Sequence, residues 1–360
     1  MVSRRDFVKS CGVATLGMGA ITWAQATVVP TLAAKTSLGL VAYSCRFQHE
    51  AQLRQTGGAG LFAPMRFLQH CVEVGAGGAQ ISLGILSREE IRTIQEFCQE
   101  FGLFLEGIVS PPRDFEDLNR FDREMQSAKD VGAMAVRTVV IPGRRYERFQ
   151  SLEDFREAEK RARGMLERAA PIAERLRLPL AVENHKDQRN EERLRLFETI
   201  SSEFVGACVD TGNSLALLED PLETVRVFAP WAKSAHLKDQ ALLAVPDGFL
   251  LADIPLGKGC LNLREMVKTL KHHQPQLNLS LELITRDPLV VPCLQEGYWT
   301  TLPDVPAIDL ARILRLAHLG PTDSGPRVSG ISKEKQVELE RQNVQESLVY
   351  ARNDLEMSAP

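Results

Sequence analysis

The sequence predicts an α/β fold, a (β/α)8 TIM barrel followed by one additional C-terminal helix. From Leu38 onward, short apolar runs alternate with longer amphipathic segments, which is typical of parallel strands joined by crossover helices. Eight such runs are present, the number that a closed barrel needs. The alternative is a doubly wound open sheet. It is less favoured because no G-x-G-x-x-G motif opens the first unit and polar residues end each of the last four strands.

The expected elements follow one another in a regular order. The strands are expected at Leu38–Tyr43, Ala79–Leu83, Leu103–Val109, Ala135–Ile141, Leu178–Glu183, Val205–Asp210, Ser234–Lys238 and Leu279–Leu283. The helices are expected at Ala63–Val74, Arg88–Phe101, Phe115–Val131, Leu152–Leu176, Asn190–Ile200, Leu222–Phe228, Leu263–His272 and Val305–Leu319. Ser87 is typical of a helix N-cap, and Gly75 and Gly102 of helix ends.

Two segments lie outside the eightfold pattern. Arg46–Leu61 is polar and contains glycine, so it is expected to be a loop at the catalytic face of the barrel. Ile331–Met357 is expected to form one more charged helix, with a narrow apolar stripe at Val337, Val344 and Leu348. Packing of this stripe on its own barrel is favoured over a dimer arm, which would make the protein a homo-oligomer.

The N-terminus predicts export. Arg4 and Arg5 precede an almost uncharged stretch that ends in Ala24-Gln25-Ala26, a small-x-small cleavage site. The motif resembles the twin-arginine export signal of bacteria, which implies the twin-arginine export machinery as a partner and a periplasmic or extracytoplasmic location. Cleavage is favoured over retention as an N-terminal anchor. The expected organisation is residues 1–26 as signal, 36–319 as barrel, and 320–360 as linker and C-terminal helix.

Composition excludes several classes of function. The chain carries 43 Lys and Arg against 47 Asp and Glu, a net charge of −4, so no broad positive field is available for nucleic acid. The seven cysteines include no C-x-x-C pair, which argues against thiolate metal sites. Mostly buried free thiols are expected, because a twin-arginine substrate folds in a reducing compartment.

Ligand-type residues end four successive strands, at the face where barrels of this kind carry out chemistry. They are Glu183 in A-V-E-N-H, Asp210 in C-V-D-T-G-N, His236 in A-H-L-K-D and Glu282 in L-E-L-I. An unpaired charge would be costly in such apolar runs, whereas one divalent cation neutralises several carboxylates. Three carboxylates and one imidazole favour Mn²⁺ or Mg²⁺, with Zn²⁺ less suited.

These strand ends together resemble the xylose isomerase-like barrel superfamily, over about Leu38 to Leu319. The superfamily includes sugar phosphate isomerases, ketose 3-epimerases, inosose dehydratases and endonuclease IV. The resemblance implies that Glu183, Asp210, His236 and Glu282 bind one divalent metal, and that Glu183 and Glu282 also act as catalytic acid and base. Many members carry a histidine three residues after the sixth-strand aspartate, where this chain has Asn213.

Further residues are candidates for substrate binding. Lys238 and His185 each lie two residues past a ligand; Lys238 could neutralise an oxyanion or pair with Asp239, and His185 could touch substrate or support a ligand. Asn213 replaces the family's histidine. Glu106 could enter the pocket or pair with Arg137, the second being slightly favoured, and Trp299 could stack on a sugar or pack in a lid.

The function expected is that of a metal-dependent sugar isomerase or epimerase. It would abstract a proton next to a carbonyl of a small carbohydrate or keto-sugar, through an enediolate. The alternatives are a keto-sugar dehydratase or 3-keto-glycoside lyase with the same metal site, and a non-catalytic sugar-binding barrel, in which the four ligands would be incompletely assembled. Nucleic acid is not expected as a partner.

Overall fold

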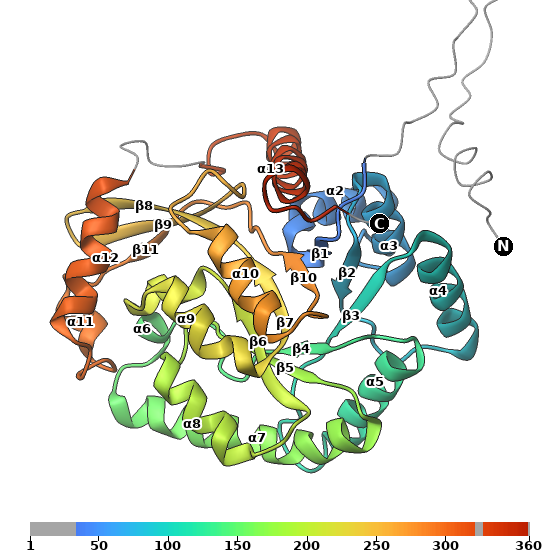
Figure 1. Ribbon diagram of the computed structural model, residues 1–360, viewed down its shortest axis with the longest axis horizontal. Coiled ribbons are helices and arrows are strands. Elements are labelled where there is room, and N and C mark those ends of the chain that lie inside the picture. Colours follow the sequence, from blue (N-terminus) through green and yellow to red (C-terminus); the bar gives the residue numbers. More distant parts are fainter. Residues whose placement is uncertain (1–33, 321–326, 359–360) are drawn as a thin grey trace, which may run out of the picture.

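A computed structural model describes residues 34–320 and 327–358, and its eight parallel strands close into a barrel (Figure 1). The strands are hydrogen-bonded in the order β1-β10-β7-β6-β5-β4-β3-β2, back to β1. They are β1 (Gly39–Val41), β2 (Gly78–Ile81), β3 (Phe104–Ile108), β4 (Val136–Thr138), β5 (Leu180–Glu183), β6 (Val205–Asp210), β7 (Ala232–Leu237) and β10 (Leu279–Leu281). Each expected strand run overlaps one of them, so the predicted fold class is confirmed.

Helices surround the barrel, and their ends follow the sequence signals. The α-helices are α2 (Arg46–Thr56), α3 (Pro64–Val74), α4 (Arg88–Phe101), α5 (Leu118–Asp130), α6 (Arg145–Arg148), α7 (Leu152–Leu176), α8 (Asn190–Ile200), α9 (Pro221–Phe228), α10 (Leu263–His273), α11 (Glu296–Trp299), α12 (Ala307–Leu319) and α13 (Lys333–Asp354). Short 3-10 turns occupy Ala42–Cys45 (η1), Asn213–Leu217 (η2) and Ala229–Trp231 (η3). Ser87 caps α4 in a capping box with Glu90, and α3 and α4 end at the left-handed glycines Gly75 and Gly102.

The expected loop at Arg46–Leu61 is wrong, because most of it is helix α2. The first-turn amides of Phe47 and Gln48 donate hydrogen bonds of 2.8 and 2.9 Å to the carboxylate of Glu340, in α13. These amides have no partner within their own helix, so a carboxylate from a distant helix satisfies them. The helix ends at Gly57, whose φ is 60°. The stabilising group lies almost 300 residues away, where local sequence does not reveal it.

A small antiparallel sheet, absent from the sequence prediction, is formed by two strands between β7 and α10 and by one strand after β10. It consists of β8 (Asp239–Val245), β9 (Gly248–Ile254) and β11 (Leu289–Val291), in the order β11-β9-β8. Ile313 and Ala317 of α12 pack against it in a hydrophobic cluster separate from the barrel core. The helix that we expected at Val305–Leu319 to cover the barrel therefore covers this sheet instead.

The C-terminal helix α13 packs on the barrel itself. Val344 and Leu348 of the expected stripe, with Ala351, belong to the same hydrophobic core as the barrel strands, whereas Val337 is not part of that core. α13 contacts α2, η1 and β10, and lies beside α2 in Figure 1. The expected packing of this helix on its own barrel is confirmed, and α13 takes the position that we had assigned to the helix at 305–319. The division of the chain at residue 319 stays a prediction.

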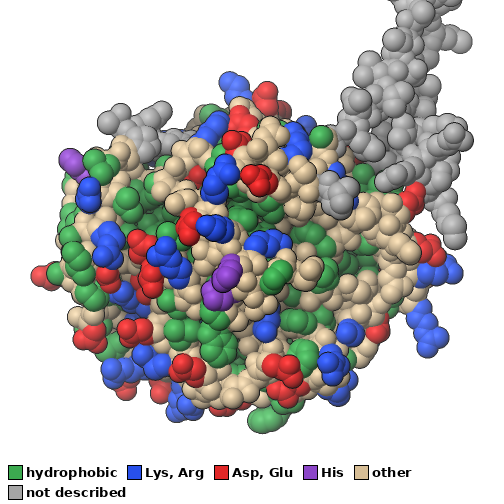
Figure 2. All heavy atoms as spheres, in the orientation of Figure 1, with side chains coloured by type: hydrophobic (Ala, Val, Ile, Leu, Met, Phe, Trp, Pro, Cys, Tyr) green, Lys and Arg blue, Asp and Glu red, His purple; other side chains and the backbone are tan. Residues whose placement is uncertain are grey.

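The expected export signal at residues 1–26 lies outside the described residues. Within residues 34–320 and 327–358, no helix combines the length and apolarity needed to cross a membrane. The cysteines of this part agree with the expectation of mostly buried free thiols: Cys45, Cys71, Cys208 and Cys293 are buried, and none is in a disulfide. On the face shown in Figure 2, the side chains of Lys and Arg alternate with those of Asp and Glu.

Candidate metal centre

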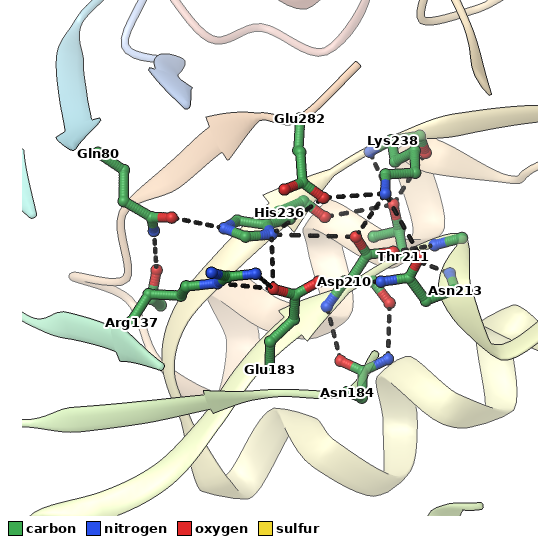
Figure 3. A network of polar contacts seen from close by, with 12 residues as sticks. Gln80, Arg137, Glu183, Asn184, Asp210, Thr211, Asn213, His236, Lys238 and Glu282 are labelled. Atoms are coloured by element: carbon green, nitrogen blue, oxygen red, sulfur yellow. Dashed lines mark hydrogen bonds and ion pairs between the residues drawn. The ribbon is translucent and has the colours of Figure 1, made fainter. Parts of the chain in front are cut away.

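The four predicted ligands converge at the carboxyl ends of their strands (Figure 3). Glu183 ends β5, Asp210 ends β6, His236 lies in β7, and Glu282 directly follows β10. The pairing of β6 with β7 sets Asp210 beside His236. All four are buried, and each offers one ligand atom within 4.8 Å of the others. Opposite ligands of one octahedral Mg²⁺ are about 4.2 Å apart, so these atoms are nearly as close as one coordination shell requires.

Two buried atoms of the cluster are available to a cation. His236 Nδ1 makes no hydrogen bond, and Asp210 Oδ2 is contacted by Lys238 Nζ, at 3.0 Å, as an ion pair. His236 Nδ1 lies 3.5 Å from Glu282 Oε2, and 3.9 Å from both Glu183 Oε2 and Asp210 Oδ2. Buried polar atoms are normally satisfied, and a divalent ion binds these donor types well. The group could therefore hold one divalent metal ion.

The other nitrogen of His236 is held from inside the barrel. His236 Nε2 lies 2.8 Å from Gln80 Oε1, and Gln80 Nε2 donates to Glu106 Oε2 at 2.8 Å. Ser234 Oγ donates to the same Glu106 oxygen at 2.6 Å. Because an amide oxygen only accepts, Nε2 donates to Gln80, and Nδ1 is the nitrogen that faces the cluster and would bind a metal.

Glu106 thus supports a ligand through Gln80, and its slightly favoured pairing with Arg137 is wrong. Burial raises the pKa of its carboxyl to about 7, although the bonds from Ser234 and Gln80 oppose this shift. The alternative partner, Arg137, does not pair with Glu106. Arg137 instead donates through Nε to Glu183 Oε2 at 2.6 Å.

Two cations compensate the carboxylates of the cluster. Burial would raise the pKa of Glu183, but Arg137 outweighs burial and holds this pKa at about 2. Lys238 Nζ lies 3.0 Å from Asp210 Oδ2 and 2.9 Å from Glu282 Oε2. Burial also opposes ionisation of Glu282, yet Lys238 and His236 hold its pKa well below the usual value. Both glutamates are therefore ionised at neutral pH.

The loop after β6 fixes the position of Asp210. Its Oδ1 accepts the backbone N–H groups of Gly212 and Asn213, both at 2.8 Å. The side-chain amide of Asn184 bonds the backbone of Asp210 at both its N–H and its C=O (Figure 3). Asn213 also reaches the cluster, because its Nδ2 donates to Glu183 Oε1 at 3.0 Å. This leaves Oδ2 of Asp210 as the oxygen that faces the other ligands.

The remaining site candidates lie at different distances from this centre. Lys238 and Asn213 contact the ligands directly. His185 is half-buried and its Nδ1 lies 3.1 Å from the backbone oxygen of Gly143, beside the centre. Trp299 donates to the backbone oxygen of Cys293 at 3.0 Å and packs on the cluster of the small sheet, without contact to the four ligands. The structure therefore does not bring Trp299 to the ligands.

Three residues of the site were not identified as such from the sequence: Gln80, Arg137 and Lys186. Lys186 lies in the loop after β5 and donates to Asn213 Oδ1. The polar Gln80 and Arg137 lie within otherwise apolar strand runs, and that mismatch is the signal that could have indicated them.

A cavity of about 440 Å³ opens on the same face of the barrel. It lies at the carboxyl ends of β1, β2 and β3, where Tyr43, Ser82 and Ser110 line it. Its outer wall carries the charged side chains of Arg113, Asp117, Arg120 and Glu124. The mouth of the barrel thus offers polar-lined space on the side opposite β5 and β6.

Comparison with known proteins identifies similar sequences and folds. The profile of the family described as "Xylose isomerase-like TIM barrel" matches residues 68–303, more than half of the chain. A curated relative, 3-oxo-isoapionate decarboxylase of Pectobacterium atrosepticum, is 24% identical over 256 residues, which cover 68% of this chain and 85% of the relative.

Solved structures share the fold at low sequence identity. The D-psicose 3-epimerase of Clostridium cellulolyticum H10, solved with D-tagatose, superposes with a TM-score of 0.57 at 11% identity, covering 88% of this chain and 98% of that one. A xylose isomerase-like TIM barrel protein of Mycobacterium smegmatis, solved with magnesium, gives a TM-score of 0.50 at 17% identity, covering 78% and 98%.

Proposed function

This chain belongs to the xylose isomerase-like TIM barrel family, and on that premise we propose that it is a metal-dependent sugar isomerase or epimerase. The enzyme abstracts a proton next to a carbonyl of a small carbohydrate or keto-sugar. The observation that carries this proposal is the convergence of Glu183, Asp210, His236 and Glu282 within 4.8 Å of one another. A non-catalytic barrel would not need these four groups assembled.

The two glutamates differ in their freedom to move a proton. Both oxygens of Glu183 accept hydrogen bonds, from Arg137 and Asn213. Glu282 is bonded only through Oε2, to Lys238, and no described residue donates to its Oε1. Glu282 is therefore the better placed base, with Glu183 on the far side of the cluster as its partner in reprotonation. A bound divalent ion, for which Mn²⁺ or Mg²⁺ is favoured over Zn²⁺, would supply the positive charge that stabilises an enediolate.

Solvent exchange tests this function. The Mn²⁺-loaded protein is incubated in D₂O with D-fructose, D-tagatose and D-psicose, and deuterium at the carbon next to the carbonyl is followed by NMR. We expect exchange with at least one sugar and its loss in Glu282→Gln. Glu338→Gln, at an exposed position of α13, is the matched control. Undiminished exchange in folded, metal-loaded Glu282→Gln would refute the assigned base.

A lyase is the second candidate, and the curated decarboxylase relative favours it. In a 3-keto-glycoside, the same enediolate expels the aglycone; in a β-keto sugar acid, the electron pair of the C–C bond moves to the carbonyl as CO₂ leaves. The same loaded protein is offered both substrate types. Release of aglycone or CO₂, without exchange into the neutral ketoses, would favour the lyase over the isomerase.

We also propose that the protein is exported through its N-terminal twin-arginine motif. The support is the sequence of residues 1–26, in which Arg4 and Arg5 precede an apolar stretch and a small-x-small site. Replacing both arginines by lysine is expected to hold the protein in the cytoplasm. Cell fractionation measures the result, and N-terminal sequencing of the wild type distinguishes cleavage after residue 26 from a retained anchor.

A further inference from the structure

A second set of charged side chains lies beside the candidate metal centre. Lys186 follows β5 and Lys238 lies between β7 and β8, and they are only 4% and 2% exposed. The ammonium group of Lys186 donates to Asn213 Oδ1, and Lys238 Nζ lies 3.4 Å from the same oxygen. Figure 3 shows Lys238 and Asn213 on the side of the cluster away from Gln80. Two buried cations thus share one neutral amide oxygen.

Lys186 lacks the compensation that Lys238 has. Lys238 is paired with Asp210 and Glu282, whereas no carboxylate of the described residues forms an ion pair with Lys186. Burial, and then the charge of Lys238, lower the pKa of Lys186 to about 8, so it remains mostly protonated at pH 7. A buried, unpaired ammonium group is costly unless an anion reaches it.

Arg286 adds positive charge at the rim. It follows β10, its side chain is 25% exposed, and it lies 2.9 Å from Asp253 Oδ2. Its Nε makes no hydrogen bond, and its charge interacts with that of Lys186. Arg286 therefore extends the cationic set from the buried lysines toward solvent.

Acidic and basic side chains are interleaved around the centre. Glu183, Asp210, Glu282 and Asp253 lie among Arg137, Lys186, Lys238 and Arg286. A divalent ion would add two positive charges to this buried group. An anionic substrate would offset that excess, whereas a neutral sugar would leave it.

We propose that Lys186, with Lys238 and Arg286 beside it, binds a carboxylate of the substrate, so that the substrate class is a sugar acid. This inference rests on the proposed function, because it assumes that a sugar-type molecule occupies the mouth of the barrel. Lys186 acts as the specificity-determining residue: it separates sugar acids from neutral sugars of the same length.

Binding of an unreactive pair of probes tests the subsite without turnover. D-gluconate and sorbitol have the same six-carbon chain, but only gluconate carries a carboxylate. Each is titrated calorimetrically into Mn²⁺-loaded protein at pH 7. We expect gluconate to bind at least tenfold more tightly than sorbitol. We expect Lys186→Met to remove most of that difference and Lys186→Arg to retain it. Lys268→Met, at an exposed position of α10, is the matched control and should equal wild type.

Several outcomes would overturn the inference. Equal binding of the two probes would do so, as would a preference for gluconate that survives in folded Lys186→Met. Mn²⁺ affinity, measured on each variant, verifies that the metal centre is intact. If Lys186→Met fails to fold, Arg286→Gln replaces it and should weaken gluconate binding at least threefold while sorbitol binding is unchanged; unchanged gluconate binding would count against the subsite.

The two proposals fail in different ways. The proposed function would be refuted, and the carboxylate subsite supported, if gluconate is preferred in a way that depends on Lys186 but no sugar shows deuterium exchange or product release. The subsite would be refuted, and the proposed function supported, if neutral ketoses exchange deuterium equally in wild type and Lys186→Met and gluconate is not preferred.

Discussion

The contact between Gln80 and His236 leads to a quantitative prediction for metal binding. Replacing Gln80 by leucine keeps a side chain of similar size but removes the amide that lies 2.8 Å from His236 Nε2. The imidazole is then free to rotate or to change tautomer, which would withdraw Nδ1 from the cluster. Loss of such an orienting bond reduces metal affinity about 10- to 100-fold, which corresponds to about 1.4–2.7 kcal/mol.

Calorimetric titration of Mn²⁺ into the metal-free protein measures this loss. The matched control is Gln240→Leu, because Gln240 is equally buried and its amide donates to Asp253 at 2.6 Å, away from His236. Both variants should lose stability, since each leaves buried polar groups without partners, at about 1–3 kcal/mol. Only Gln80→Leu should lose Mn²⁺ affinity. A dissociation constant within twofold of wild type in folded Gln80→Leu would refute the reasoning, as would an equal loss in Gln240→Leu.

Three further predictions concern stability. Asp187 and Arg193 form a fully buried ion pair with an N–O distance of 2.7 Å, so Asp187→Ala should lower the free energy of unfolding by about 3–5 kcal/mol in urea titrations; a loss below about 1 kcal/mol would contradict this. Leu348 lies in the part of α13 that packs on the barrel core, so Leu348→Ala should lower the free energy of unfolding by about 2–5 kcal/mol in the same measurement. A much smaller loss would show that this part of α13 does not pack on the core. Burial raises the pKa of Glu340 from 4.5 to about 7, so the native protein binds this proton more tightly than the unfolded chain does. The free energy of unfolding should then fall as the pH rises between these values, and Glu340→Gln should weaken that slope; an unaltered slope would show that Glu340 does not cause it.

The barrel and its ligands could be predicted because the signals are local. Each strand is a short apolar run, and the ligand at its end is the residue that breaks the apolar pattern. Glu183 and Asp210 are the last residues of β5 and β6, so an ordinary barrel topology was enough to predict that they meet.

The remaining features depend on contacts that no local pattern contains. Helix α2 starts at backbone amides that donate to the carboxylate of Glu340. Helix α12 packs on the small sheet and not on the barrel, so α13 covers the barrel in its place. The hairpin of β8 and β9 did carry a signal, since Asp247-Gly248 lies between two apolar runs. Lys186 has no such signal, because a lysine in a loop is ordinarily solvent-exposed.

The first and last described segments are in contact at the amino-terminal end of the barrel strands. Thr36 pairs with Ser358, and the backbone N–H of Ser37 donates to the oxygen of Met357 at 2.7 Å. Both lie near the amino end of β1, whereas the ligands lie at the carboxyl ends of the strands. A tag, a surface linker or a fusion partner attached at residue 34 or residue 358 would therefore leave the substrate entrance unobstructed. For the same reason, joining residues 34 and 358 by a short linker and opening the chain elsewhere should give a circular permutant with an unaltered site.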